Sequence, residues 1–174
     1  RSSIISYNTM LFMEKYDVII VGGATSGSYF AKLLAEKGHK VLIIEKNSKE
    51  KVGSKYDIFH MPKKEFEHFN VPLPKKGDKE WAFEFEKNVS LSAENKYPKA
   101  TSFEVVGLHM HEYVESLNDW AKSYGAKIEY NATFLKVIYK DGVACGIVYE
   151  KDGEKIEIEC KLIADCSGIP SIVR

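Results

Sequence analysis

The chain has 174 residues, of which 44% are hydrophobic, and its 25 Lys and Arg residues balance its 25 Asp and Glu residues. Zero formal net charge gives no general attraction to nucleic acid or to an anionic membrane, so we expect neither as a partner. No apolar run approaches the roughly 18 residues of a transmembrane segment, and the length suits one domain with a substantial core.

Residues 1–13 lack the features of a secretory signal, because serines, Tyr7 and Asn8 interrupt their apolar residues. We expect them to be an upstream or disordered extension. The three cysteines, at positions 145, 160 and 166, are odd in number and lack metal-ligand spacing. They indicate reduced thiols and a cytoplasmic protein. No histidine has a carboxylate or cysteine at a spacing that specifies a metal site, so we expect no metal.

The first clear pattern predicts a strand, a glycine turn, a helix and a second strand. Asp17–Val21 is a short β-branched run typical of a strand buried on both faces. Apolar residues recur at helical spacing from Ser26 to Lys37, and Gly38 follows where a helix commonly ends. Val41–Ile44 is a second buried strand. The unit spans about thirty residues, as in dinucleotide-binding folds.

The glycine turn predicts a phosphate site, because a helix N-terminus offers unpaired N–H groups and a partial positive charge. Gly22 and Gly27 hold the outer positions of G-x-G-x-x-G, for the tight turn and for close packing of the helix. Ala24 replaces the usual middle glycine, so its Cβ lies where a pyrophosphate would approach. The turn contributes Gly22, Gly23, Ala24, Thr25, Ser26 and Gly27 as candidate binding residues.

Glu45 follows the second strand, about twenty residues after the turn, where a carboxylate accepts hydrogen bonds from an adenosine ribose. A carboxylate there would repel a ribose 2′-phosphate, so we do not expect NADP at this site. Lys46 is the next residue and a further candidate. A flavodoxin-like strand-helix-strand unit without a dinucleotide is the alternative.

Residues 52–103 have no single period, and we expect a small β-rich segment inserted on the substrate side. Residues 52–61 suggest a loop, beside a ligand or as a plain connector, and Lys63–Phe69 a short helix. Alternation over Lys79–Lys87 predicts a half-buried strand with Trp81, Phe83 and Phe85 on one face. That face could line an apolar pocket or belong to ordinary core. Residues 89–93 are expected to pair with this strand, and residues 103–106 to form another strand.

A long helix and an antiparallel meander follow. An apolar stripe predicts a helix from about His109 to Tyr124, and then a buried strand to Tyr130, in the order of a doubly wound sheet. Three strands separated by Asp-Gly turns are predicted over residues 133–140, 143–150 and 154–160. Residues 162–164 are predicted to form a separate short strand.

The two ends of the chain together resemble the FAD-binding domain of the p-hydroxybenzoate hydroxylase and geranylgeranyl reductase group of flavoproteins. The first match is D-V-I-I-V-G-G-A-T-S-G through to Glu45, and the second is D-C-S-G-I-P-S-I-V-R at residues 165–174. The resemblance covers nearly everything after Met13. It implies an α/β fold: a Rossmann-like FAD/NAD(P)-binding domain over residues 14–174, with a parallel sheet and an inserted antiparallel β-meander.

The resemblance also implies roles for particular residues. The turn from Gly22 to Gly27 would hold the FAD pyrophosphate and Glu45 the adenosine ribose, while the main chain at Phe134 would lie by the adenine. Asp165 and Gly168 would lie near the pyrophosphate and the route of NAD(P)H, a possible electron donor beside a donor protein. Catalytic residues are not identified.

The D-C-S-G turn resembles the reductases more than the hydroxylases. The implied reaction is reduction of a small apolar substrate, for example an isoprenoid double bond, by FADH2. A flavin-dependent monooxygenase and a non-catalytic dinucleotide-binding module are the alternatives. Because members of the group continue into a third FAD segment and a substrate domain, we expect an N-terminal fragment, incomplete at its C-terminus and inactive alone.

Overall fold

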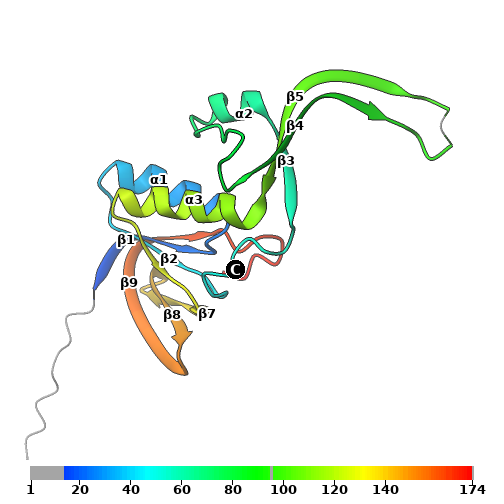
Figure 1. Ribbon diagram of the computed structural model, residues 1–174. Coiled ribbons are helices and arrows are strands. Elements are labelled where there is room, and N and C mark those ends of the chain that lie inside the picture. The colour runs from blue at the N-terminus through cyan, green and yellow to red at the C-terminus, as the bar shows by residue number, and fades with distance from the viewer. Residues whose placement is uncertain (1–13, 95, 174) are drawn as a thin grey trace, which may run out of the picture.

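The computed structural model describes residues 14–94 and 96–173, in which three helices and nine strands form two sheets (Figure 1). The expected extension over residues 1–13, and Arg174 of the second signature, lie outside the described residues. The helices are α1 (Thr25–Glu36), α2 (Lys63–His68) and α3 (Met110–Ser123). The strands are β1 (Lys15–Val21), β2 (Val41–Ile44), β3 (Ile58–Pro62), β4 (Trp81–Ser90), β5 (Lys99–His109), β6 (Lys127–Glu129), β7 (Thr133–Lys140), β8 (Val143–Lys151) and β9 (Glu154–Asp165).

The larger sheet combines a parallel and an antiparallel part. Its strand order is β6-β2-β1-β9-β8-β7. The strands β6, β2, β1 and β9 are parallel, whereas β8 pairs antiparallel with both β9 and β7. The predicted Rossmann-like parallel sheet with a meander is therefore confirmed.

Different layers cover the two faces of the parallel strands. Alternate residues of β1 and β2, such as Ile20 and Ile43, pack with Ala31 of α1 and Ala121 of α3. The opposite face packs against the meander strands, through residues such as Ile147. Figure 1 places α1 and α3 together on one side of the sheet. A doubly wound sheet was thus the wrong expectation, since both helices lie on one face and the meander covers the other.

Strand β9 is the element that joins the two parts of this sheet. Residues 154–159 pair antiparallel with β8, and residues 159–165 pair parallel with β1. The prediction of a separate short strand at residues 162–164 was wrong, because the chain stays extended through Lys161. In Figure 1 the strand curves strongly as it passes from one part to the other.

The second sheet has the order β3-β5-β4 and is antiparallel. One face packs on α2 and α3, where Phe66, Leu108 and Tyr113 form a buried cluster with Trp81 at its edge. The predicted single aromatic face is wrong. A register shift between Trp81 and Phe83 places Trp81 opposite Leu108 but Phe83 opposite Gly107, on the other face.

Two further expectations for this segment fail. Residues 58–61, expected in a loop, belong to β3 because their backbone pairs with β5. Residues 89–93 do not pair back onto β4. Instead Val89 continues β4 and pairs with Ala100 of β5, so the two strands form the long hairpin that projects from the body in Figure 1. No helix in the described part of the chain is long and apolar enough to cross a membrane.

Candidate functional site

The glycine turn lies at the carboxyl end of β1, between β2 and the second signature. Gly22 has a φ of +107°, a backbone conformation that residues with a side chain rarely adopt. Its N–H donates to the Ile44 carbonyl over 2.8 Å. A Cβ on Gly22 would lie 2.4 Å from the Cys166 carbonyl oxygen. The turn therefore requires glycine here, both for its conformation and for contact with the chain after β9.

Gly27 allows α1 to approach this turn. A Cβ on Gly27 would lie 1.9 Å from the Gly22 carbonyl oxygen and 3.3 Å from a methyl group of Ile20. Any larger residue would push the helix away from β1. The predicted role of Gly27 in close packing is confirmed by this geometry.

The N-terminus of α1 has no side-chain cap. Ala24 is the N-cap residue, and no side chain caps the helix, whose first turn contains no acidic residue. The first N–H groups of α1, from Thr25 to Gly27, have no intrahelical partner by the geometry of any helix start. Ala24 has a φ of −81°, which alanine adopts without strain. The backbone therefore does not demand glycine at the middle position.

Glu45 reaches back to the glycine turn. Its side chain is buried, and Oε2 accepts the Gly23 N–H over 2.8 Å. Oε1 accepts both the backbone N–H and the side-chain amide of Asn47, each over 2.8 Å. A carboxylate has about four acceptor positions, so these three bonds leave room for a further donor.

The second signature is organised by Asp165. Its Oδ1 accepts the N–H and the hydroxyl of Ser167, and Oδ2 accepts the Ser171 hydroxyl and the Val173 N–H. Desolvation raises the pKa of Asp165, but these hydrogen bonds outweigh it and hold the pKa below its ordinary value. Asp165 therefore shapes the turn that carries Gly168, which has a φ of +86°.

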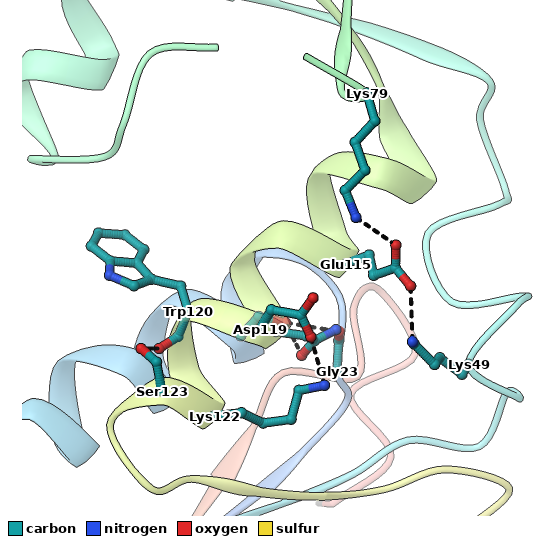
Figure 2. A network of polar contacts seen from close by, with 10 residues as sticks. Gly23, Lys49, Lys79, Glu115, Asp119, Trp120, Lys122 and Ser123 are labelled. Carbon is teal, nitrogen blue, oxygen red and sulfur yellow. Dashed lines mark hydrogen bonds and ion pairs between the residues drawn. The ribbon is translucent and has the colours of Figure 1, made fainter.

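A buried polar network fixes the glycine turn from the other side. Asn118 of α3 donates through Nδ2 to the Gly23 carbonyl over 3.1 Å, and its Oδ1 lies 2.8 Å from the Ser28 hydroxyl. Figure 2 shows Gly23 beside α3, next to the ion pairs of that helix. The sequence analysis missed Asn118. Its signal was the helical period, which places a polar residue four positions after Val114 on the buried stripe.

These elements enclose a cavity of about 430 Å³, within the usual range of small-molecule sites. Of the predicted site residues, Gly22, Ala24, Glu45, Lys46, Phe134 and Gly168 line it. Gly23, Thr25, Ser26, Gly27 and Asp165 do not line it, although Gly23 and Asp165 hold its walls in place. Wall residues that the sequence analysis did not assign come mainly from the loop after β2 and from the last residues: Lys51, Val52, Gly53, Lys55, Tyr56, Met110, Thr133, Ser167, Ile169, Pro170 and Ile172.

A second hollow of about the same volume opens on β4, lined by Lys63, Glu84, Phe85, Glu86 and Lys87. It lies away from the carboxyl ends of the parallel strands, where ligands of open α/β sheets bind. The cavity at the glycine turn is therefore the stronger candidate. Among residues 14–94 and 96–173, no group of three His, Cys, Asp or Glu side chains is placed to hold a metal ion.

An uncapped helix start after β1, a buried acid after β2 and a cavity lined by Ala24 and Glu45 are the features of a dinucleotide-binding domain of the Rossmann type. Residues 15–174 match the family model of the FAD binding domain, so the chain belongs to that family and its cofactor is FAD. The resemblance inferred from the two signatures is thereby confirmed.

Curated relatives include digeranylgeranylglycerophospholipid reductases. The protein of Sulfolobus acidocaldarius is 26% identical over 156 residues, covering 88% of this chain and 34% of the relative. That of Methanospirillum hungatei is 28% identical over 164 residues, covering 91% and 39%. The chain thus spans between a third and two-fifths of the length of these relatives.

Solved structures agree on the fold. A geranylgeranyl bacteriochlorophyll reductase-like protein from Thermoplasma acidophilum superposes with a TM-score of 0.81 at 23% identity, over 92% of this chain and 41% of that one. The p-nitrophenol 4-monooxygenase PnpA from Pseudomonas putida gives a TM-score of 0.67 at 14% identity, over 88% and 41%.

Proposed function

We propose that the chain is the FAD-binding part of an FAD-dependent oxidoreductase that reduces an apolar, isoprenoid-type double bond. The observation that carries the proposal is that Gly22 of the glycine turn, Ala24 at the uncapped start of α1 and Glu45 all line one cavity. The names of the curated relatives from Sulfolobus acidocaldarius and Methanospirillum hungatei, both digeranylgeranylglycerophospholipid reductases, support the substrate class.

The residues at the cavity suit the parts of FAD. The helix start from Gly22 to Gly27 would hold the pyrophosphate, since its free N–H groups and positive end favour an anion. Glu45 would accept a ribose hydroxyl at its remaining acceptor position, with Lys46 at the rim. The main chain at Phe134 would lie by the adenine, and Gly168 near the pyrophosphate, on the turn that Asp165 shapes.

When bound, FAD would supply the hydride chemistry, and the chain would supply position and exclusion of water. The meander and the parallel strands bury Ile19 and Leu42 in one apolar cluster with Val21 and Ile44, and the last two line the cavity, so this part of its wall is apolar. NAD(P)H or a donor protein would provide the electrons. We also propose a cytoplasmic location, for which the free thiols of Cys145, Cys160 and Cys166 are the support.

We propose that residues 52–103 form the substrate side of a domain that extends over residues 14–174. On the face of β3-β5-β4 opposite the helices, His60 packs edge-on against Phe83 and Phe85, with ring centres 5.4 and 5.6 Å apart. Phe83 lies directly over Gly107, where a Cβ would meet its ring at 2.7 Å. This aromatic face would suit a small apolar substrate.

A flavin monooxygenase is the second candidate, because the fold is shared with p-nitrophenol 4-monooxygenase. The test begins with the absorbance spectrum of the protein produced from its own gene, which should show bound flavin. Reduced anaerobically and mixed with a geranylgeranyl lipid, the protein should oxidise its flavin and hydrogenate the lipid without oxygen. Product formed only with oxygen, and carrying an oxygen atom, would support the monooxygenase. If the protein binds flavin but forms neither product, the remaining candidate is a non-catalytic dinucleotide-binding module.

A further inference from the structure

The loop after β2 carries four lysines with two different surroundings. Lys46, Lys51 and Lys55 line the cavity. Lys49 instead forms an ion pair with Glu115 of α3, with Nζ 3.1 Å from Oε1, outside the cavity (Figure 2). Three of the four lysines of the loop therefore lie at the wall of the cavity, and the fourth is paired with a carboxylate outside it.

The backbone of this loop is held in a defined position, although the side chains of Lys51 and Lys55 are exposed. Val52 is buried, and its carbonyl oxygen lies 2.6 Å from Nδ1 of His111, which must carry the proton that is donated. Gly53, with a φ of +76°, packs directly on the first turn of α3, where a Cβ would lie 3.0 Å from a Val114 methyl group. These contacts fix the backbone between Lys51 and Lys55.

The charges around the cavity do not cancel. Three lysines line it, and the sole carboxylate among the lining residues is that of Glu45, whose oxygens already accept three hydrogen bonds. In the described part of the chain, neither Lys51 nor Lys55 has a carboxylate oxygen within 4.0 Å. Lys55 Nζ lies 5.5 Å from the centre of the Tyr56 ring, which also lines the cavity. The walls thus present an excess of positive charge, since no carboxylate among residues 14–94 and 96–173 forms an ion pair with Lys46, Lys51 or Lys55.

We propose that Lys51 and Lys55 are specificity residues that recognise the diphosphate of the bound dinucleotide. This inference rests on the proposed function, because FAD binding supplies the diphosphate that the two ammonium groups would face. The helix start of α1 would contact the diphosphate on one side through backbone N–H groups. The loop after β2 would contact the diphosphate on the other side through the ammonium groups of Lys51 and Lys55, which are point charges at the ends of flexible side chains.

The test compares ADP with adenosine as ligands of the protein produced from its own gene, freed of flavin. Lys51→Gln and Lys55→Gln should each weaken ADP binding about three- to tenfold, since an exposed charge-assisted contact is partly screened. Adenosine, which lacks the phosphates, should bind both variants as it binds the wild type. Lys49→Gln is the matched control, because it removes an equal charge from the same loop and should leave both affinities unchanged.

Two kinds of failure are distinguishable. If the wild type binds neither FAD nor ADP, the proposed function is wrong. If the wild type binds ADP and the Lys51 and Lys55 variants match Lys49→Gln, or lose ADP and adenosine equally, the lysine inference is wrong. In a variant that carries both Lys51→Gln and Lys55→Gln, ADP affinity should depend less on salt than in the wild type, and this result would further support the lysine inference.

Discussion

The hydroxyl of Ser28 and the side-chain amide of Asn118, ninety positions apart in the chain, meet between α1 and α3 with 2.8 Å between Ser28 Oγ and Asn118 Oδ1. Both residues are completely buried. Through Asn118 Nδ2 the contact extends to the Gly23 carbonyl, so the helix pair and the glycine turn share one polar network.

Replacing Asn118 with Ala should destabilise the protein, because the buried Gly23 carbonyl would lose one of its two side-chain donors and keep only the Ser28 hydroxyl, at 2.8 Å. We expect a decrease of about 1–3 kcal/mol in the free energy of unfolding, measured by urea denaturation. Ser123→Ala is the control, since its exposed hydroxyl bonds only to the Trp120 carbonyl, and it should change stability by less than about 0.5 kcal/mol. Equal effects of the two variants would mean that the network does not stabilise the turn.

Replacing Gly27 with Ala should displace α1 from the turn and prevent retention of FAD, because the new Cβ would overlap the Gly22 carbonyl oxygen at 1.9 Å. The flavin absorbance of the purified variant measures this directly. Gly38→Ala is the comparison, because no atom lies within 4 Å of its Cβ position, and its φ of +83° costs only about 1–2 kcal/mol. A Gly27 variant with a full complement of flavin would disprove the packing argument.

Replacing Glu45 with Gln keeps the size of the side chain but turns an amide donor toward the N–H groups of Gly23 and Asn47. At least one of these N–H groups would lose its acceptor. The ribose hydroxyl of FAD would also face a neutral acceptor in place of a charged carboxylate oxygen. FAD affinity should fall about tenfold, as measured by titration of the flavin-free protein. Glu157→Gln, on an exposed position of β9, should bind as the wild type does. Unchanged affinity in the Glu45 variant would remove this residue from the site.

Glu115 predicts a dependence of stability on pH. Hydrogen bonds from Lys79 and Lys49, with N–O distances of 2.7 and 3.1 Å, lower the pKa of Glu115 from 4.5 to about 2 (Figure 2). Because the folded pKa is the lower one, the stabilisation is fully present above pH 4.5 and is lost as the pH falls toward about 2.

The comparison is between the wild type and Glu115→Gln in chemical denaturation at several pH values. Near neutral pH the wild type should be more stable by about 0.5–1 kcal/mol, an amount typical of exposed ion pairs. The difference should shrink below pH 4.5 and in high salt. A constant difference across this range would assign the effect to something other than the carboxylate charge.

The sequence predicted the parts of the fold that depend on local pattern. Residues 17–45 combine a strand buried on both faces with glycines at fixed spacing, and each feature restricts the backbone strongly, so strand, turn, helix and Glu45 were all placed correctly. Asp-Gly pairs located both turns of the meander, because their residues accept positive φ: Asp141, Gly142, Asp152 and Gly153 all adopt it.

Features that depend on distant partners could not be predicted in this way. The continuous β9 exists because β8 and β1 pair with its two halves, and alternation in the sequence cannot reveal a change of partner. The bulge near Ala82 moves Trp81 and Phe83 to opposite faces, which a strict period of two does not allow. The loop after β2 has no period at all, and contacts with distant residues hold it at the cavity: Val52 and Gly53 contact α3, and the Asn47 carbonyl accepts the Asn131 N–H.

The pairing of β1 with β9 has a consequence for the order in which the protein folds. Val21 pairs with Asp165, and Gly22 packs under the carbonyl of Cys166, so the first strand and its turn find their neighbours among residues made far later. Contacts of such high sequence separation close large loops and slow folding. On the ribosome, β1, α1 and β2 can associate early, but the cavity wall that Gly22 shares with Cys166 is completed only after β9 has emerged.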